Sequence, residues 1–368
     1  MRFTCSAADM GAALFMVTRA IATRPVLPIL EGVRIASCEG GLRLTCTDLA
    51  LGMETQIPAD VQEPGSTVLP GKLLSEIVRK LPEGTLEVQV NARHGALLLC
   101  AGSRTNLSGM APEEFPALPE VGEAREIELP QSLLREMIQR TSFAIASDES
   151  RPVLTGCLLE TAGERLTVVA LDGFRLAMRN EVFSSPLPEL SVVVPGKVLN
   201  EIARILKDSE EMVKLHLGGT HLLADMGDTR VVARLLDGEF VRYRQVLPKE
   251  SKTRIIIVKK ELETAMERAS LMAREGKNNL VRLHMADQAL LITSNAELGD
   301  VREEIPVTMT GDALDIAFNV RYLTDTLRAI EDEEIVLQFN NNISPCVILP
   351  TSGEKFLYLA LPVRVYNA

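Results

Sequence analysis

Two stretches of this chain, VLPGKLLSEIVRKL at residues 68–81 and VVPGKVLNEIARIL at residues 193–206, follow one pattern. A third, fainter version, NVRYLTDTLRAI, lies at residues 319–330. Each places apolar residues at helical spacing with charged residues between them, which indicates an amphipathic helix. In the first two, a Pro-Gly pair precedes the helix and is typical of a strand-to-helix corner. The chain is therefore predicted to contain three copies of one unit.

Other segments repeat in step with these helices. A strand-like run ends in a turn at Asp48, again at Asp172, and a third time at Asn295. Each copy opens with a short β-like stretch, and helices are predicted to follow at residues 6–22, 131–147 and 259–275. The tetrapeptide RPVL occurs at 24–27 and 151–154, and both occurrences are predicted to start the strand after the first helix of their copy.

Each copy thus reads as strand, helix, strands, then strand, helix, strands again. Strands cluster between the helices instead of alternating with them, which favours an α+β unit with antiparallel sheets over a doubly wound one. Two short charged segments, near 121–126 and 248–253, separate the copies. The predicted domains are 1–123, 124–250 and 251–368.

Composition narrows the class of protein. Aromatic residues make up 4% of the 368 residues and Trp is absent, so the core must be aliphatic. The six cysteines are scattered and form no C-x-x-C pair, which favours buried thiols in a reducing compartment. No apolar run reaches the length of a membrane span, and no signal segment is visible, so a cytoplasmic protein is expected.

The sequence contains no recognisable catalytic constellation. The histidines His94, His216, His221 and His284 lack further ligands at metal-binding spacing. Phosphate-binding loops and the nucleophile elbow are missing as well. The Asp-Gly pairs read as turns. A threefold architecture without a repeated acid, base or metal set predicts a binding scaffold that needs no cofactor, not an enzyme.

Charge is divided unevenly along the chain. The net charge is −11, yet six predicted helical segments, taken as residues 6–24, 72–81, 131–147, 197–207, 259–277 and 320–330, sum to +8 and the remainder to −19. One interpretation is ordinary solvated helix faces. The other is a helix-lined surface that contacts phosphates without reading bases. The cations that supply much of this charge are Arg24, Lys72, Arg79, Lys80, Arg140, Lys197, Arg204, Lys207, Arg268, Arg274, Lys277, Arg321 and Arg328.

The ordered set of motifs resembles the bacterial sliding clamps, the beta subunits of DNA polymerase III, over the whole chain. The motifs are RPVLPIL (24–30), LTCTDL (44–49), VLPGKLLSEIVRKLP (68–82), SRPVLTG (150–156), LTVVALDGFRLA (166–177), VVVPGKVLNEIARIL (192–206), LLDGEFVRYRQVLP (235–248) and YLALPVRVY (358–366). The resemblance implies three clamp domains of two helices each on antiparallel sheets, forming half of a closed ring. Two subunits would join head-to-tail around duplex DNA, with helices lining the hole and no chemistry performed.

The resemblance also assigns residues. It carries over Arg24, Lys72 and Lys197 as DNA contacts, whereas the other helix cations rest on charge and periodicity. A cleft for short peptides from polymerases, the clamp loader and repair proteins would be lined by Leu154, Leu171, Gly173, Phe174, Arg175, Leu176, Val241, Val246, Leu359, Ala360, Leu361, Pro362, Val363 and Arg364. Phe174 stands where the family often has His, and Val241 and Gln245 replace a frequent Pro and a frequent basic residue. A different peptide preference is therefore expected.

Two other classes remain open at this point. A clamp-like scaffold could have lost DNA and kept only peptide partners, as in a duplicated copy that gives resistance to an inhibitor. An α+β enzyme is the third class, which the missing catalytic residues disfavour. The positive helices favour the DNA-encircling clamp.

Overall fold

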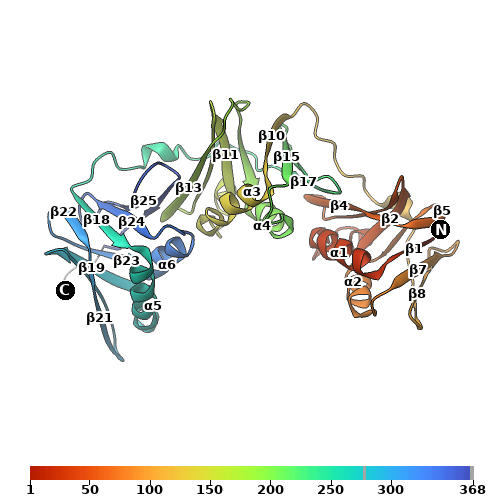
Figure 1. Cartoon of the computed structure of the whole chain (residues 1–368), viewed down its shortest axis with the longest axis horizontal. Helices are drawn as coiled ribbons and strands as arrows, with labels where there is room; N and C mark the ends of the chain where they lie inside the picture. Colours follow the sequence, from red (N-terminus) through yellow and green to blue (C-terminus); the bar gives the residue numbers. More distant parts are fainter. Residues whose placement is uncertain (277–278, 365–368) are drawn as a thin grey trace. The chain divides into compact units, whose positions relative to one another are not determined.

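The computed structural model describes residues 1–276 and 279–364. Within this part of the chain lie six α-helices (Figure 1): α1 Ala7–Val17, α2 Gly71–Lys80, α3 Gln131–Gln139, α4 Gly196–Ile205, α5 Lys259–Glu275 and α6 Val320–Arg328. The helices predicted at 6–22 and 131–147 are shorter than expected. The 3₁₀ turns Thr18–Ala20 and Ser142–Ala144 continue beyond the ends of α1 and α3.

The chain divides into two compact units. Unit 1 comprises Met1–Leu134 with Glu201–Leu235, and unit 2 comprises Arg135–Asn200 with Leu236–Ala368. The predicted central domain contributes strands to both units. The central domain is divided in this way because its strands pair with strands of the preceding and the following repeat, and each such pair lies within one continuous sheet.

Unit 1 contains two antiparallel sheets. The eight-stranded sheet has the order β10-β15-β16-β17-β4-β3-β2-β6, and the five-stranded sheet has the order β5-β1-β7-β8-β9. Their strands are β1 Arg2–Ser6, β2 Gly32–Cys38, β3 Gly41–Thr47, β4 Leu51–Pro58, β5 Asp60–Glu63, β6 Ser66–Pro70, β7 Thr85–Val90, β8 Ala96–Cys100, β9 Ser103–Leu107, β10 Arg125–Pro130, β15 Met212–Leu217, β16 His221–Asp225 and β17 Thr229–Arg234. The joint between repeats is β4 with β17, in a register that sets Thr55 opposite Thr229.

Unit 2 repeats this plan. Its nine-stranded sheet has the order β14-β11-β12-β13-β26-β25-β24-β18-β22, and its four-stranded sheet the order β21-β20-β19-β23. The strands are β11 Gly156–Ala162, β12 Arg165–Leu171, β13 Arg175–Val182, β14 Ser191–Pro195, β18 Thr253–Val258, β19 Leu280–Ala286, β20 Ala289–Ala296, β21 Gly299–Pro306, β22 Thr308–Gly311, β23 Leu314–Asn319, β24 Glu334–Phe339, β25 Cys346–Pro350 and β26 Phe356–Ala360. Here β13 joins β26 and sets Arg179 opposite Phe356.

The helices are amphipathic, as the repeated pattern predicts. In α2, Leu74 and Val78 are buried, whereas Lys72, Arg79 and Lys80 on the other side of the helix are exposed. Burial of the apolar stripe against the sheets is the main source of stability for so short a helix.

The glycine of the Pro-Gly-Lys motif has a packing reason. A Cβ at Gly71 would lie 2.4 Å from Ile21 Cδ1, and one at Gly196 would lie 2.7 Å from Ile145 Cδ1. In both repeats an isoleucine that follows the first helix packs against the start of the second. The third repeat has Val320 at the start of α6 instead.

The two RPVL segments are not structural equivalents. Residues 24–27 form an irregular segment, and the 3₁₀ turn Pro28–Glu31 comes after them. The second RPVL itself lies in the 3₁₀ turn Pro152–Thr155. Each turn leads directly into a strand that begins with glycine, so the predicted strand starts at RPVL are wrong. The equivalent of the second RPVL is the overlapping LPIL at residues 27–30.

The repeated aspartate turns are alike in the first two repeats. Asp48 accepts hydrogen bonds from the backbone N–H groups of Ala50 and Leu51. Asp172 accepts the equivalent bonds from Phe174 and Arg175. At the third position, Asn295 instead lies inside a ladder, paired with Asp300.

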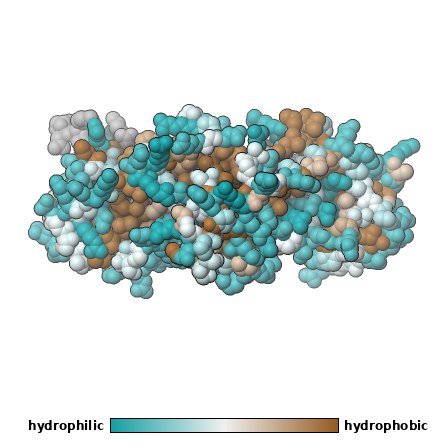
Figure 2. Space-filling view, turned by 90° about the horizontal axis from the view of Figure 1, so that it is seen from above, coloured by the Kyte–Doolittle hydropathy of each residue, from teal (hydrophilic) through white to brown (hydrophobic). Residues whose placement is uncertain are grey.

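Hydrophilic residues cover much of the surface drawn in Figure 2, and hydrophobic residues gather between them in separate patches. No helix of the described chain is long and apolar enough to cross a membrane. The same residues contain no cluster of His, Cys, Asp or Glu that could hold a metal ion.

Candidate nucleic-acid and partner-binding surfaces

The cations of α2 form the strongest candidate for phosphate contact. Lys72, Arg79 and Lys80 are exposed, and none makes an ion pair within the part of the chain that the structure describes. Lys72 and Arg79 are almost two helical turns apart and therefore share one face of the helix. Arg24, in the segment after α1, is also exposed and lacks an ion pair among the described residues. These four side chains are available to an external anion.

On α4 the predicted cations have partners within the chain. Lys197 is exposed at the start of the helix and already has an interaction of its own. Arg204 lies 2.5 Å from Glu201, and Lys207 lies 2.8 Å from Glu211. Exposed ion pairs of this kind contribute little energy, so a phosphate could compete for Arg204 and Lys207.

The predicted cations of the third repeat are mixed in character. Arg274 is exposed without an ion pair among the described residues. Arg268 binds Glu303 through two hydrogen bonds of 2.7 and 2.6 Å, which occupy its guanidinium edge. Arg321 and Arg328 lie 3.8 and 3.7 Å from Asp325 and Glu267, which are loose surface pairs. Lys277 lies outside the described residues.

Arg140 does not belong with the exposed cations. Its side chain is buried and donates a hydrogen bond to the carbonyl oxygen of Ala329. It also pairs with Glu331 at 2.6 Å. Its Nε lies 2.8 Å from Glu136 Oε1, in an ion pair without hydrogen-bond geometry. Arg140 is therefore a structural cation, because the helical pattern that predicted it cannot distinguish a solvent-facing charge from one enclosed by an adjoining repeat.

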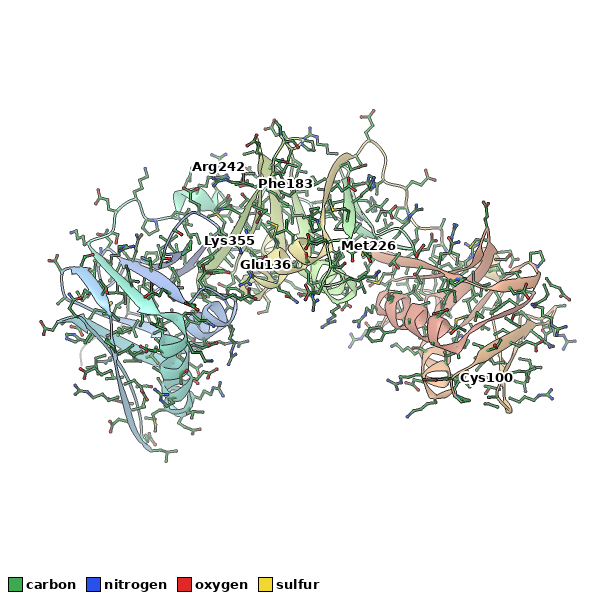
Figure 3. The ribbon with its side chains drawn as sticks, viewed as in Figure 1. Cys100, Glu136, Phe183, Met226, Arg242 and Lys355 are labelled. Atoms are coloured by element: carbon green, nitrogen blue, oxygen red, sulfur yellow. The ribbon has the colours of Figure 1, made fainter. Side chains whose placement is uncertain are left out.

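Glu136 is the centre of this buried network. Its carboxylate lies 3.4 Å from Arg179 Nε and 3.4 Å from Lys355 Nζ, in addition to Arg140. Figure 3 labels Glu136 and Lys355, whose side chains lie together. Burial opposes ionisation of Glu136, but Arg179, Lys355 and Arg140 outweigh it and lower the pKa of the carboxyl below its ordinary value of 4.5.

The predicted peptide cleft rests on a buried apolar cluster in unit 2. Leu154, Leu171, Leu176 and Leu359 are all buried in it, together with Phe240 and Tyr243. Leu361 packs against it from the surface. Ala360 is buried as well. The structure thus brings together predicted residues from three distant parts of the chain, and most of them form the floor of the surface.

Only some of the predicted cleft residues have side chains that are exposed and therefore available to a partner. Phe174 is 57% exposed, Val241 41% and Val246 52%, which is unusual for large apolar residues. Pro362 and Val363 are partly exposed, and Arg364 is exposed. We call Phe174, Val241, Val246, Leu361 and Val363 the apolar shell. Exposed apolar groups above an ordered apolar cluster are typical of a protein-binding surface.

The backbone fixes the shell in place. The Leu361 N–H donates to the Phe174 carbonyl oxygen at 2.8 Å, and the Val363 N–H donates to that of Ala317 at 2.8 Å. Gly173 adopts a φ of +92°, which favours glycine, and turns the chain between β12 and β13 so that Phe174 projects outward.

Arg175 has a structural role within this surface. It is buried and donates to Asp172 at 3.0 Å and to Asp325 at 2.7 Å. Its guanidinium also lies over the Tyr322 ring, 5.1 Å from the centroid. Tyr322 in turn stacks on Phe174 with centroids 6.0 Å apart. Tyr322 and Asp325 were missed from the sequence, because they lie on a helix whose pattern indicated only an amphipathic face.

Glu160 anchors the other side of the cluster. The Tyr243 hydroxyl donates to it, and Arg244 forms an ion pair with it at 2.5 Å. Burial first, and then the hydrogen bond to Glu160, raise the pKa of Tyr243. Tyr243 therefore remains a neutral donor that fixes the segment bearing Val241 and Val246.

Comparison with known proteins agrees with this geometry. Profiles of the DNA polymerase III beta subunit match along the chain, the N-terminal domain at residues 1–119, the central domain at 128–242 and the C-terminal domain at 244–364. The beta sliding clamp of Bacillus subtilis (strain 168) is 34% identical over 378 residues, covering 100% of both chains. That of Halalkalibacterium halodurans is 35% identical, covering 95% of this chain and 96% of the relative.

This chain belongs to the DNA polymerase III beta subunit family, the beta sliding clamps. Solved clamps have the same fold. The Bacillus subtilis structure superposes with a TM-score of 0.96 at 34% identity, covering 100% of both chains. A Pseudomonas aeruginosa clamp bound to griselimycin superposes with a TM-score of 0.93 at 30% identity, covering 99% of this chain and 100% of the other. The clamp is thus a non-catalytic processivity factor of three α+β clamp domains.

Proposed function

We propose that two copies of the clamp close head-to-tail into a ring around duplex DNA in the cytoplasm and tether polymerases to it. Tethering replaces bimolecular rebinding with a local encounter at high effective concentration. The observation that carries this proposal is the set of exposed cations on and near α2 that form no ion pair with any described residue, in a chain whose net charge is −11. An acidic protein with such a local basic surface can hold a polyanion there and repel it elsewhere.

The strand order supports ring closure. Within the chain, repeats join where β4 pairs with β17 and where β13 pairs with β26. By position in the repeat, β21 corresponds to β4 and β13, and β9 corresponds to β17 and β26. Both β21 and β9 are edge strands of their sheets. We propose that β21 of one copy pairs with β9 of a second, which would cover both edges.

DNA binding would be electrostatic and independent of sequence. Arg24, Lys72 and Lys197 would contact phosphates, with Arg79, Lys80, Arg204, Lys207, Arg274, Arg321 and Arg328 as further contacts. Removal of one cation that neutralises a phosphate should lower the slope of log affinity against log salt by about 0.9. Weak contacts of this kind permit sliding along the duplex.

The apolar shell would take short peptides from polymerases, the clamp loader and repair proteins. The phenylalanine at position 174, stacked on Tyr322, gives this wall an aromatic and apolar face. We propose that partner peptides place an aliphatic or aromatic residue against it, because apolar contact is what the wall offers.

The decisive experiment measures retention on nicked circular DNA after loading by a clamp loader. A ring should remain on the circle during gel filtration and should be lost when the circle is linearised. Reversal of charge at Arg24, Lys72 and Lys197 to Glu should reduce loading and retention several-fold, whereas Lys249→Glu, at an exposed cation outside the helices, should not. Equal retention on linear and circular DNA would refute encirclement.

A further inference from the structure

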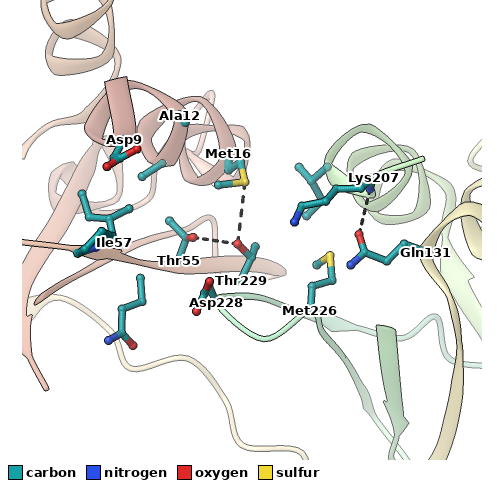
Figure 4. Close-up of a pocket in the computed structure, with 14 residues that line it drawn as sticks. Asp9, Ala12, Met16, Thr55, Ile57, Gln131, Lys207, Met226, Asp228 and Thr229 are labelled. Carbon is teal, nitrogen blue, oxygen red and sulfur yellow. Dashed lines mark hydrogen bonds between the residues drawn. The ribbon is translucent and has the colours of Figure 1, made fainter. Parts of the chain in front are cut away.

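A pocket of about 270 Å³ lies inside unit 1, where α1 faces the joint between β4 and β17 (Figure 4). Apolar side chains line much of it, among them Ala12, Ala13 and Met16 of α1. Thr55 and Thr229 face each other across the strand joint, with their hydroxyl oxygens 2.8 Å apart. The apolar shell proposed for polymerase peptides lies in unit 2, so this pocket is a separate feature.

Because the chain contains repeats, the residues around this pocket can be compared with the residues at the equivalent positions of unit 2. Ala12 and Met16 occupy the same positions along α1 as Glu136 and Arg140 occupy from the start of α3. Thr55 occupies the same position along β4 as Arg179 occupies along β13. The strand joints correspond in register, so that Asp228 corresponds to Lys355.

In unit 2 this corner is filled by the buried network. The guanidinium of Arg179 is 1% exposed and hydrogen-bonds the backbone carbonyl oxygens of Asn180 and Lys355. Its Nη2 donates to Glu181 at 2.9 Å, and its Nε lies 3.4 Å from Glu136. In unit 1 Ala12, Met16 and Thr55 stand at the positions of Glu136, Arg140 and Arg179, so the two arginines of unit 2 have no counterpart there, and a hollow remains.

The charges around the hollow favour a cation over an anion. Asp9 and Asp228 line it, are exposed, and have no ion pair within the described part of the chain. The one cationic lining residue is Lys207, whose Nζ is already 2.8 Å from Glu211. Gln131 adds a buried amide, and its Oε1 accepts a hydrogen bond from the Lys207 backbone N–H at 3.0 Å. The methylenes of an arginine would pack against Met16 and the two alanines, and its guanidinium would face the carboxylates.

We propose that this pocket is a second docking site of the clamp, which accepts an arginine side chain from a short segment of a partner protein. Arg179 of this chain is the model for the bound arginine, because the equivalent corner of unit 2 encloses the Arg179 side chain. We call the pocket the arginine site. One lining residue, Lys207, is also a proposed phosphate contact, so the peptide is titrated into the clamp without DNA. A failed retention assay would then leave the arginine site unaffected, and the reverse also holds.

The test uses the blocked tripeptide acetyl-Leu-Arg-Leu-amide and the same peptide with citrulline in place of arginine. Citrulline keeps the shape and removes the charge. With methyl-labelled methionine in the full chain, NMR titration should move the Met16 and Met226 signals, which come from residues lining the pocket. The Met178 signal, from the apolar cluster of unit 2, should stay in place. The citrulline peptide should bind at least about fivefold more weakly, as expected when a charged interaction of roughly 1 kcal/mol is removed.

Variants make the assignment specific. Asp228→Asn should weaken the arginine peptide at least about threefold, whereas Asp60→Asn, an exposed aspartate of the same unit outside the pocket, should not. Thr55→Arg should fill the hollow with an internal guanidinium and abolish the shifts. Ala12→Met, a smaller change that also fills the hollow, serves if Thr55→Arg lowers the melting temperature. Equal binding of the citrulline peptide, shifts at Met178 instead of Met16, or an unaltered titration of Asp228→Asn would each overturn the proposal.

Discussion

Single residues decide whether a repeated position becomes part of a surface or part of the interior. Arg140 and Arg79 were both predicted as helix cations, yet Arg140 is enclosed with Glu136, Arg179 and Lys355, while Arg79 faces solvent. Buried charges persist only when they are paired, so the enclosure of Arg140 depends on groups that come from distant segments. Helical spacing alone could not reveal these groups.

Glu136→Gln should destabilise unit 2 at neutral pH by roughly 1–3 kcal/mol, because the buried Arg140 and Arg179 and the exposed Lys355 lose their shared carboxylate. The pKa of Glu136 is lowered in the folded state, so its stabilisation is complete above about pH 4.5 and is lost as the pH falls through the lowered value. The gap between wild type and variant in urea unfolding should therefore narrow below pH 4.5. Glu354→Gln, at an exposed ion pair, is the control, and a gap that does not depend on pH would contradict the assignment.

Gly71→Ala should cost about 1–3 kcal/mol of unfolding free energy, since the new methyl group would overlap Ile21 Cδ1. Gly219→Ala is the matched control, because nothing lies within 4 Å of a Cβ there. Adding Ile21→Val, which removes the overlapping carbon, should recover part of the loss in urea denaturation. If the two substitutions were simply additive, the packing explanation of the Pro-Gly-Lys motif would be wrong.

At the scale of elements, the sequence predicted the second helix more accurately than the first in the first two repeats, whereas in the third repeat α5 coincides with the predicted 259–275. The patterns at 68–81, 193–206 and 319–330 enclose α2, α4 and α6 and extend past them by at most three residues at either end. The helices α1 and α3 end early because the chain turns into a 3₁₀ segment that carries Ile21 or Ile145 toward the next helix. Apolar periodicity continues through that turn and therefore could not mark the helix end.

The segment after β26 should dominate peptide binding. Leu361→Ala with Val363→Ala should weaken a polymerase-tail peptide about tenfold, because less apolar surface is buried in a small interface. Fluorescence anisotropy of a labelled peptide measures this. Val182→Ala removes an equally exposed apolar side chain on β13 outside the apolar shell, and it should leave the affinity unchanged. If the double variant bound the peptide with unaltered affinity, the apolar shell would not be the peptide-binding site.

The helix α2 should set the salt dependence of DNA binding. Lys72→Glu with Arg79→Glu should lower the slope of log affinity against log salt by about 2, because two phosphates would no longer be neutralised by the protein. Lys249→Glu provides a matched reversal outside the helix. An unchanged slope would place the DNA-binding surface elsewhere.

At the scale of the whole molecule, the recurrence of motifs was sufficient to predict three tandem units and the family, but not how their sheets combine. At the joints β4–β17 and β13–β26, the sequences of the two strands do not indicate that they pair with each other. An antiparallel ladder requires only alternating side chains and unpaired backbone N–H and C=O groups, which many strands offer. The same limit applies to the arginine site, which appears only when corners of two repeats are compared in space.

Light scattering should give a mass near twice 40.3 kDa for the proposed homodimer at micromolar concentration. Pairing of β21 with β9 would also protect the backbone amides of both strands from hydrogen exchange, and dilution to monomer should expose them together. A particle of 40.3 kDa at every concentration would exclude the ring.

The shared ladders have a consequence for how this protein can be divided. A fragment of the chain that contains one repeat would lack the neighbouring strands that belong to the adjacent repeat. The backbone N–H and C=O groups along the edge of β4 or β13 would then be unpaired and exposed to water. Such fragments should aggregate or pair with each other. A single sequence repeat is therefore not a unit that can be excised and expected to fold on its own. A stable fragment must keep both strands of each joint, β4 with β17 and β13 with β26, and these four strands come from all three repeats.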